Sequence, residues 1–338
     1  MQEISDKLVL AFPGGEVLSV APFGVGVGFL SLMHVCELKK QSGEVIRVVI
    51  KDLPPKDHPL HEFTLPIHER ELSFYREFGD TESIANSISR AVIVESSLVL
   101  HFLEGYSMPD YWLGMTDTQI KSTLSSLAPI HALHWSAPGS TAEYPAWLKP
   151  KDKDFLISVY TQYEDNIKKL GGEEVSEILE KINNNLDTIV TCFYSSGKSQ
   201  GVVQGDLWNN NILINEKEEA KIVDWQFCCR MNPLTDVAFL ICSSSPVSLR
   251  KAKEMEWIQF YHENLMKSLG SSAPGDYSLD QCVQEFQQAK LYAFLMMVAS
   301  IELYEANKDK QTDLASRYVS LIQEIDDILP ALLSNKQT

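Results

Sequence analysis

In the first hundred residues, apolar positions occur in short runs bounded by turn residues, which is the pattern of β-strands. Strands are expected in five runs, at 16–23, 29–38, 45–51, 91–96 and 98–103. The run from Pro66 to Phe78 instead has helical spacing, with the proline in a first-turn position. The pattern therefore predicts a small β-rich region that contains one helix.

After Glu104 the apolar positions recur every three or four residues, which is typical of long amphipathic helices. The sequence TDTQ at 116–119 matches a capping box and opens the first of them. Further helices are expected at about 152–169, 173–194, 247–268, 278–304 and 312–334. A chain of 338 residues is long enough for two cores. We therefore expect an α+β protein with two domains, a β-rich one at 1–104 and a mostly helical one at 105–338.

Composition narrows the classes of function. The formal net charge of −17 disfavours nucleic acid and anionic membranes as partners. The longest apolar run, 291–303, contains a glutamate and is too short to span a bilayer. Six cysteines without a CxxC pair indicate free thiols, and the N-terminus lacks the pattern of a signal peptide. A cytoplasmic protein is expected, and nothing indicates an obligate protein partner.

Residues 203–214, VQGDLWNNNILI, place an aspartate and an asparagine five residues apart in front of an apolar strand. A polar turn follows at 215–219, and the next strand, AKIVDW, ends near Asp224. A β-hairpin of this kind returns Asp224 to the vicinity of Asp206 and Asn211. The sequence thus predicts two carboxylates and one amide at one edge of a short sheet.

These side chains are the types that phosphoryl transfer to an alcohol requires. The protein mainly positions the partners and neutralises charge. Asp206 suits the role of catalytic base, which accepts the proton of the hydroxyl. Asn211 and Asp224 suit the binding of Mg²⁺, a hard cation that prefers oxygen ligands. A buried, unpaired carboxylate at Asp224 would be costly, and a bound cation removes that cost.

The same residues carry a family resemblance. QGDLWNNNILI, then KIVDWQ, then NPLTD, resemble the catalytic and metal-binding segments of the ecdysteroid-kinase-like (CHK kinase-like) phosphotransferases. Choline kinases and aminoglycoside phosphotransferases are more distant relatives of that group. The resemblance covers about residues 20–265, and it implies a bilobal protein-kinase-like fold. Gln204 stands where the family usually has histidine, a residue that braces the loop. Asp236 in NPLTD is expected to cap a helix and to tie down the catalytic loop.

The resemblance also implies residues that bind ATP. Lys51, at the end of the strand VIRVVIK, matches the lysine that holds the α- and β-phosphates. Val49 lies on the same strand face, beside the adenine. Glu71 in HERELSFYREF matches the helix glutamate that pairs with the lysine. The resemblance also implies nucleotide contacts by the glycines of FGVGVGF and by two further residues. These residues are Gly24, Gly26 and Gly28 of the glycine-rich sequence, together with Ser31 and Leu103.

The acceptor is expected to be a small molecule. Only eleven residues separate Asp224 from Asp236, too few for the activation segment that forms a peptide groove in protein kinases. The resemblance implies an ATP- and Mg²⁺-dependent O-phosphotransferase acting on a steroid-like or natural-product alcohol. A choline- or aminoglycoside-type kinase with a cationic acceptor is one alternative. A catalytically inactive nucleotide-binding module is another, although Lys51, Asp206, Asn211 and Asp224 are all present.

Overall fold

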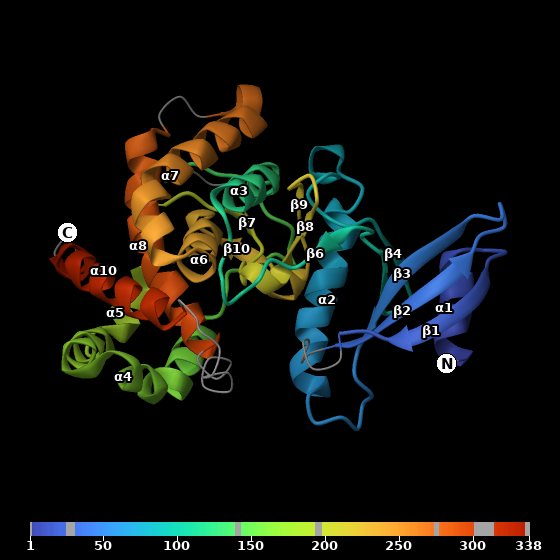
Figure 1. The fold of residues 1–338 in the computed structure, drawn as a ribbon, viewed down its shortest axis with the longest axis horizontal. Helices are drawn as coiled ribbons and strands as arrows, with labels where there is room; N and C mark the ends of the chain where they lie inside the picture. The colour runs from blue at the N-terminus through green and yellow to red at the C-terminus, as the bar shows by residue number, and fades with distance from the viewer. Residues whose placement is uncertain are drawn as a thin grey trace. The chain divides into compact units, whose positions relative to one another are not determined.

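The chain forms two compact units (Figure 1). The structure, a computed structural model, describes residues 2–24, 31–138, 143–192, 198–273, 277–300 and 314–334. The first unit comprises Met1–Tyr106 together with Lys221–Cys228, and the second comprises Ser107–Ala220 and Cys229–Thr338. The fold is α+β, as predicted. The division expected after residue 104 did not anticipate that Lys221–Cys228 belongs with the first unit.

An antiparallel five-stranded sheet forms the core of the first unit, in the order β1-β2-β3-β5-β4. Its strands are β1 (Glu16–Pro22), β2 (Leu32–Lys39), β3 (Val45–Asp52), β4 (Ala91–Val94) and β5 (Ser97–His101). The sequence predicted all five. A short 3₁₀ helix, η1 (Glu82–Ile84), precedes β4.

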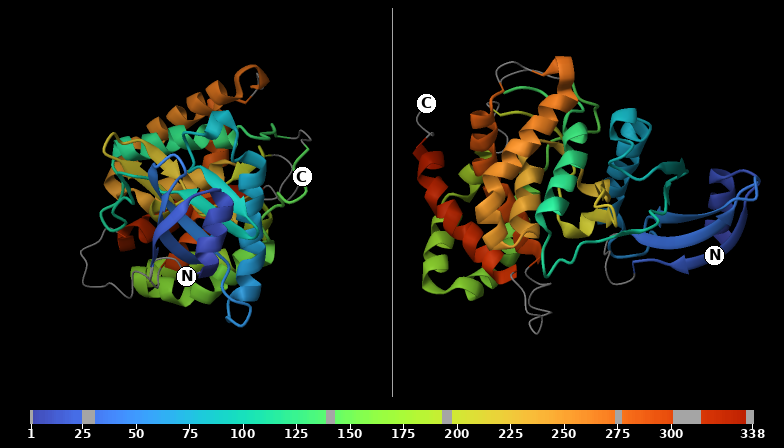
Figure 2. Two further views of the ribbon diagram at one scale, coloured as in Figure 1. Left: turned by 90° about the vertical axis from the view of Figure 1, so that its right-hand side faces the viewer. Right: turned by 45° about the horizontal axis from the view of Figure 1, so that its top comes forward.

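Helix α1 (Gln2–Ala11) covers one face of this sheet (Figure 2). Its Leu8 is fully buried in a cluster with Cys36, Leu38, Val48, Ile50 and Val99. The sequence analysis missed α1, because that segment was tested only as a signal peptide, although Ile4, Leu8 and Ala11 share a helical face. Since strand side chains alternate, Val49 and Lys51 lie on the opposite face of β3.

Helix α2 (His61–Phe78) begins five residues before the predicted start. The expectation that Pro66 occupies the first turn was therefore wrong, because the proline lies inside the helix. A proline there leaves the carbonyl of Glu62 without its intrahelical donor. Both Pro66 and Glu62 are exposed, so water can satisfy that carbonyl and the helix continues.

The second unit is mostly helical. Its helices are α3 (Asp117–His131), α4 (Lys153–Asn183), α5 (Leu186–Cys192), α6 (Leu234–Ser244), α7 (Val247–Leu269), α8 (Leu279–Met297) and α10 (Leu314–Ser334), with η4 (Gly270–Ser272) and η5 (Val298–Ser300). Every residue of α6 is buried, and α6 packs against α8. Helix α6 is therefore the centre of the helical core.

Two small sheets complete the fold. One pairs β7 (Gly201–Val203) with β10 (Cys229–Met231), and the other has the order β6 (Tyr106–Ser107), β8 (Ile212–Asn215), β9 (Ala220–Ile222). Strands β8 and β9 are the hairpin predicted from the sequence. Within the described residues, no helix combines the length and the apolar character needed to cross a membrane.

Helix boundaries in the second unit agree with the sequence prediction at one place and differ from it at another. The capping box of Thr116 and Gln119 forms at the start of α3, as predicted. The helices expected at 152–169 and 173–194 are divided differently, because α4 runs from 153 to 183 and α5 follows it. Gly172 has non-helical angles inside α4, with φ of 71°, so the expected interruption is present as a break within one helix.

Candidate functional site

In the first unit, Lys51 bridges two carboxylates. It lies on β3 and is only 4% exposed. Its Nζ is 2.7 Å from Glu71 Oε2 and 2.9 Å from Asp224 Oδ1. Burial alone would lower the pKa of Lys51, but the charges of Asp224 and Glu71 outweigh it and raise the pKa above its ordinary value. Lys51 is therefore a fixed, fully protonated cation.

Glu71 links this cation to the segment that follows Asp224. It is 1% exposed on α2, and burial raises its pKa despite the nearby ammonium of Lys51. Its second oxygen, Oε1, accepts the backbone N–H of Trp225 at 3.1 Å. The pairing of Lys51 with Glu71 that the resemblance implied is present, and Glu71 also fixes the main chain beside Asp224.

Asp224, Trp225 and Gln226, which we call the DWQ segment, form a strained turn. Asp224 has left-handed backbone angles, φ 59° and ψ 77°, and it caps the 3₁₀ helix η3 (Trp225–Phe227). The ring of Trp225 stacks on Phe74 of α2, with centroids 3.9 Å apart and an interplanar angle of 3°. The side chain of Asp224 remains 40% exposed. The turn therefore presents a carboxylate to solvent from a rigid base.

In the second unit, the loop between β7 and β8 carries Asp206. The backbone N–H groups of Gln204 and Gly205 donate to Asp236, at 2.6 and 2.9 Å. Asp236 was expected to cap a helix and to tie down this loop; the expected cap is wrong, because Pro233 is the N-cap residue of α6 and no side chain caps it. The fully buried Asp236 does hold the loop and also contacts His131 Nε2 at 3.2 Å.

A buried lysine and a tyrosine hold the same loop through a carbonyl. Lys151 Nζ and Tyr292 OH both donate to the carbonyl oxygen of Gly205, and Lys151 also donates to Tyr292 OH at 2.8 Å. Lys151 is 4% exposed and Tyr292 is fully buried. Sequence reasoning missed both residues, because neither belongs to a local motif. Gly205, which immediately precedes Asp206, is thus fixed at its N–H and at its C=O.

Asp206 and Asn211 are brought together by this loop. Asn211 lies in η2 (Asn209–Asn211), and its Nδ2 donates to the backbone carbonyl of Asp206 at 2.8 Å and to Asp206 Oδ2 at 3.1 Å. The side-chain Oε1 of Gln204 accepts the N–H of Asp206 at 2.7 Å. Gln204, at the family's usual histidine position, therefore braces the loop through its amide.

Within the described residues, the other positions predicted to bind the nucleotide form fewer polar side-chain contacts than Lys51 does. Val49 is 8% exposed on the Lys51 face of β3, and Leu103 is half-buried after β5. Gly24 has a φ of 67°, a conformation that favours glycine. Gly26 and Gly28 lie outside the described residues. Ser31 Oγ accepts a hydrogen bond from Gln226 Nε2 at 2.8 Å.

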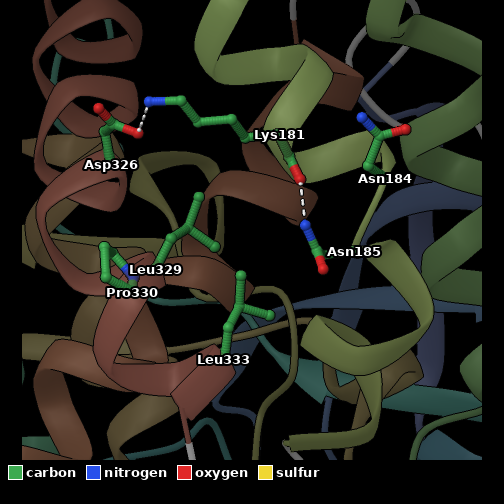
Figure 3. A pocket seen from close by; sticks show the side chains of 7 residues that line it. All are labelled: Lys181, Asn184, Asn185, Asp326, Leu329, Pro330 and Leu333. Atoms are coloured by element: carbon green, nitrogen blue, oxygen red, sulfur yellow. Dashed lines mark hydrogen bonds and ion pairs between the residues drawn. The ribbon is translucent and has the colours of Figure 1, made fainter.

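A pocket elsewhere in the second unit contains none of these residues. Its volume is about 360 Å³, and its lining comprises Lys181, Asn184, Asn185, Asp326, Leu329, Pro330 and Leu333 (Figure 3). Two of these lining residues, Lys181 and Asp326, form an ion pair of 2.7 Å. Among the described residues, no group of three or more His, Cys, Asp or Glu side chains is arranged to hold a metal.

Three solved structures of small-molecule kinases have a similar fold. The choline kinase LicA from Streptococcus pneumoniae is 14% identical, with a TM-score of 0.54, covering 96% of this chain and 98% of that chain. An ethanolamine kinase from Plasmodium vivax is 13% identical, with a TM-score of 0.55, covering 98% and 89%. The ADP-bound aminoglycoside phosphotransferase APH(2'')-Ib is 13% identical, with a TM-score of 0.52, covering 95% and 97%. At these identities the likeness establishes the fold, which is the predicted protein-kinase-like one.

Family membership rests on the sequence. A comparison with curated proteins found no match. The model of the ecdysteroid kinase-like family, a family of kinase-like phosphotransferases, matches residues 26–272, which is well over half of the chain. That range includes Lys51, Glu71 and Asp224, which we call the Lys51 cluster. It also includes the loop between β7 and β8 that carries Asp206, which we call the Asp206 loop. The protein belongs to the ecdysteroid kinase-like family.

Proposed function

We propose that the protein is an ATP- and Mg²⁺-dependent O-phosphotransferase that phosphorylates a hydroxyl group of a small molecule. The observation that carries the proposal is the buried ammonium of Lys51, held between Glu71 and Asp224. A surface lysine would need no such support. A lysine fixed in this way is suited to hold the phosphates of a nucleotide as a point charge.

Asp206 is the proposed catalytic base. Its backbone is held by several hydrogen bonds. Asp236 accepts the N–H groups of Gln204 and Gly205, and the side chain of Gln204 accepts the N–H of Asp206 itself. Lys151 donates to the carbonyl of Gly205. Fixing the loop fixes the carboxylate relative to the acceptor hydroxyl, and misplacement by about 1 Å can cost about a hundredfold in rate. The bonds to Asn211 further restrict its side chain.

Asn211 and Asp224 are the proposed protein ligands of Mg²⁺. Because the amide nitrogen of Asn211 donates to Asp206, its amide oxygen is the atom that would coordinate the cation. An amide oxygen and a carboxylate fit Mg²⁺, which is usually bound by one or two carboxylates together with phosphate oxygens and water. When bound, Mg²⁺ would neutralise charge on the transferred phosphoryl group.

For the acceptor we propose a steroid-like or natural-product alcohol, in line with the family. A cationic acceptor of the choline or aminoglycoside type is the second candidate, because the net charge of −17 favours cations. We also propose a cytoplasmic, reducing environment. Five cysteines in the described chain are buried free thiols: Cys36, Cys228, Cys229, Cys242 and Cys282.

The test is a screen of metabolite alcohols with ATP and Mg²⁺, in which ADP release and product mass are both measured. The panel contains neutral sterol-like alcohols and cationic amino alcohols. We expect a product heavier by one phosphoryl group for at least one neutral alcohol. Phosphorylation of cationic alcohols alone would favour the second candidate.

The Asp206→Asn variant separates catalysis from binding in the same assay. We expect kcat to fall by about 10²- to 10⁴-fold, because the proton acceptor is lost, while Mg-ATP binding is retained. Asp165→Asn, an exposed surface change, is the matched control. An unchanged kcat in Asp206→Asn would refute the assigned base.

A further inference from the structure

Three consecutive residues of the DWQ segment are held by three different parts of the first unit. Asp224 is held by Lys51 of β3, and Trp225 by Glu71 and Phe74 of α2. Gln226, which is 2% exposed, donates from Nε2 to Ser31 Oγ at 2.8 Å. The proposed function assigns no role to the hydrogen bond between Gln226 and Ser31.

The left-handed angles of Asp224 make these contacts necessary. A non-glycine residue in that region costs of the order of 1 kcal/mol and persists where the surroundings determine the conformation. Lys51 restrains the turn at Asp224, and the stack on Phe74 restrains it at Trp225. The hydrogen bond from Gln226 to Ser31 restrains the C-terminal end of the turn.

The direction of this bond decides what Ser31 can do. A hydroxyl has one hydrogen to donate and two lone pairs that accept. Because Ser31 Oγ accepts from the amide of Gln226, its own hydrogen is left for another acceptor. Phosphate oxygens accept and do not donate. Ser31 is half-buried, and in the sequence it lies two residues after the glycine-rich FGVGVGF.

We propose that Gln226 is a positioning residue that orients the Ser31 hydroxyl as a hydrogen-bond donor to the phosphates of a bound nucleotide. The inference rests on the proposed function and adds a second task to the DWQ segment. Asp224 serves the metal, and two residues later Gln226 prepares a phosphate contact. Metal binding and phosphate binding are thereby built on one rigid turn.

The decisive variant is Gln226→Glu, which keeps the shape of the side chain and reverses the polarity of the bond. A carboxylate would accept the hydrogen of Ser31, so that the hydroxyl could no longer donate to a phosphate. Dissociation constants for Mg-ATP and for adenosine are measured by calorimetry. We expect Mg-ATP binding to weaken by about tenfold or more, and adenosine binding to stay unchanged, because adenosine has no phosphate.

Three further variants complete the design. Ser31→Ala removes the donor with little risk to folding, and it should also weaken Mg-ATP binding by about tenfold. The double variant should bind within about twofold of Gln226→Glu, because both changes remove the same contact. Gln119→Glu is the matched control for charge, since glutamate also serves in the capping box with Thr116. We expect no effect there.

The outcomes separate the inference from the proposed function. If the wild-type protein fails to bind Mg-ATP, both are overturned. If it binds Mg-ATP and Gln226→Glu or Ser31→Ala binds equally well, only the inference fails. Equal losses for adenosine and Mg-ATP would also overturn it, because they would show a general structural defect. A loss confined to the phosphate-bearing ligand supports it.

Discussion

The protein contains two buried clusters of charge that differ in balance. The first is the Lys51 cluster, formed by Lys51, Glu71 and Asp224. The second, which we call the α7–α10 cluster, joins three helices through Arg250, Glu254, Lys290 and Glu324. In the second cluster two cations meet two carboxylates, and the most exposed side chain, Glu324, is 22% exposed.

The Lys51 cluster has one cation for two carboxylates, and Asp224 is 40% exposed. A buried group of charges that serves structure alone gains from exact compensation, because uncompensated charge is costly. An excess of negative charge with an open carboxylate is what a site for a cation requires. The difference in charge balance therefore supports the proposed role of the Lys51 cluster in binding, whereas the α7–α10 cluster serves as a clamp between helices.

The largest expected effect on stability is that of Arg250→Met. Arg250 is 1% exposed and makes two bonds of 2.7 Å to Glu324, so its loss leaves the half-buried carboxylate of Glu324 without its two shortest hydrogen bonds. We expect a loss of about 4 kcal/mol in the free energy of unfolding, measured with urea. Mg-ATP affinity should be unchanged. Lys253→Met, at an exposed ion pair, is the control. Weakened Mg-ATP binding in Arg250→Met would contradict a purely structural role for the α7–α10 cluster.

Lys51→Met should lower both stability and nucleotide affinity. We expect about 3 kcal/mol less unfolding free energy, because Glu71 stays buried without its cation. The double change Lys51→Met/Glu71→Gln should recover most of that stability, since the buried charge is gone. It should not recover Mg-ATP binding. Recovery of both properties would show that Lys51 has only a structural role.

The α7–α10 cluster predicts a specific dependence on pH. Burial opposes ionisation of Glu324, but the hydrogen bond from Arg250 and the charges of Arg250 and Lys290 lower its pKa to about 2. A carboxyl with a lowered folded-state pKa stabilises the fold above its ordinary value of 4.5, and this contribution disappears as the pH falls toward 2.

The variant Glu324→Gln tests this dependence. The wild-type protein should exceed it by about 2 kcal/mol near pH 6, and the gap should close as the pH falls from 4.5 toward 2. Unfolding free energies measured by urea across that range check the prediction. A gap that is independent of pH would show that ionisation of Glu324 does not contribute.

The smallest effect is expected at a surface cluster that has the same pKa. Hydrogen bonds from Lys121 and Lys253 lower the pKa of Glu256 to about 2, yet this side chain is exposed. Exposed pairs are screened by salt. Glu256→Gln should therefore leave stability unchanged in 0.5 M salt, where Glu324→Gln remains destabilising. Equal effects of both variants would mean that burial does not distinguish the clusters.

Much of the fold was predictable because it depends on local pattern. The five strands, the β8–β9 hairpin and the capping box of α3 each have short-range signals. Helix α1 and the start of α2 were missed, since tertiary packing stabilises α1 and Pro66 is tolerated where Glu62 is exposed. The pairing of Lys51 with Glu71 was predictable only through the family resemblance.

Part of the support of the Asp206 loop, that from Lys151 and Tyr292, could not be predicted from the sequence. Lys151 and Tyr292 are separated by 141 positions and meet at the carbonyl of Gly205. For Asp236, the expected hold on the loop is present, since it accepts the N–H groups of Gln204 and Gly205, but the expected helix cap is not. Contacts of this kind depend on tertiary packing, because a side chain that holds a distant backbone group leaves no periodic or spacing signal.

The central claim is that Asp224 makes nucleotide binding depend on Mg²⁺. The most direct measurement is a thermal-shift titration of the wild-type protein and Asp224→Asn with ATP, in Mg²⁺ and in EDTA; asparagine is chosen because it tolerates the left-handed angles. We predict that ATP with Mg²⁺ stabilises the wild-type protein, by about 2.7 kcal/mol at a hundred times Kd, and that Asp224→Asn loses the Mg²⁺-dependent part. The same Mg²⁺-dependent shift in both proteins would contradict the account.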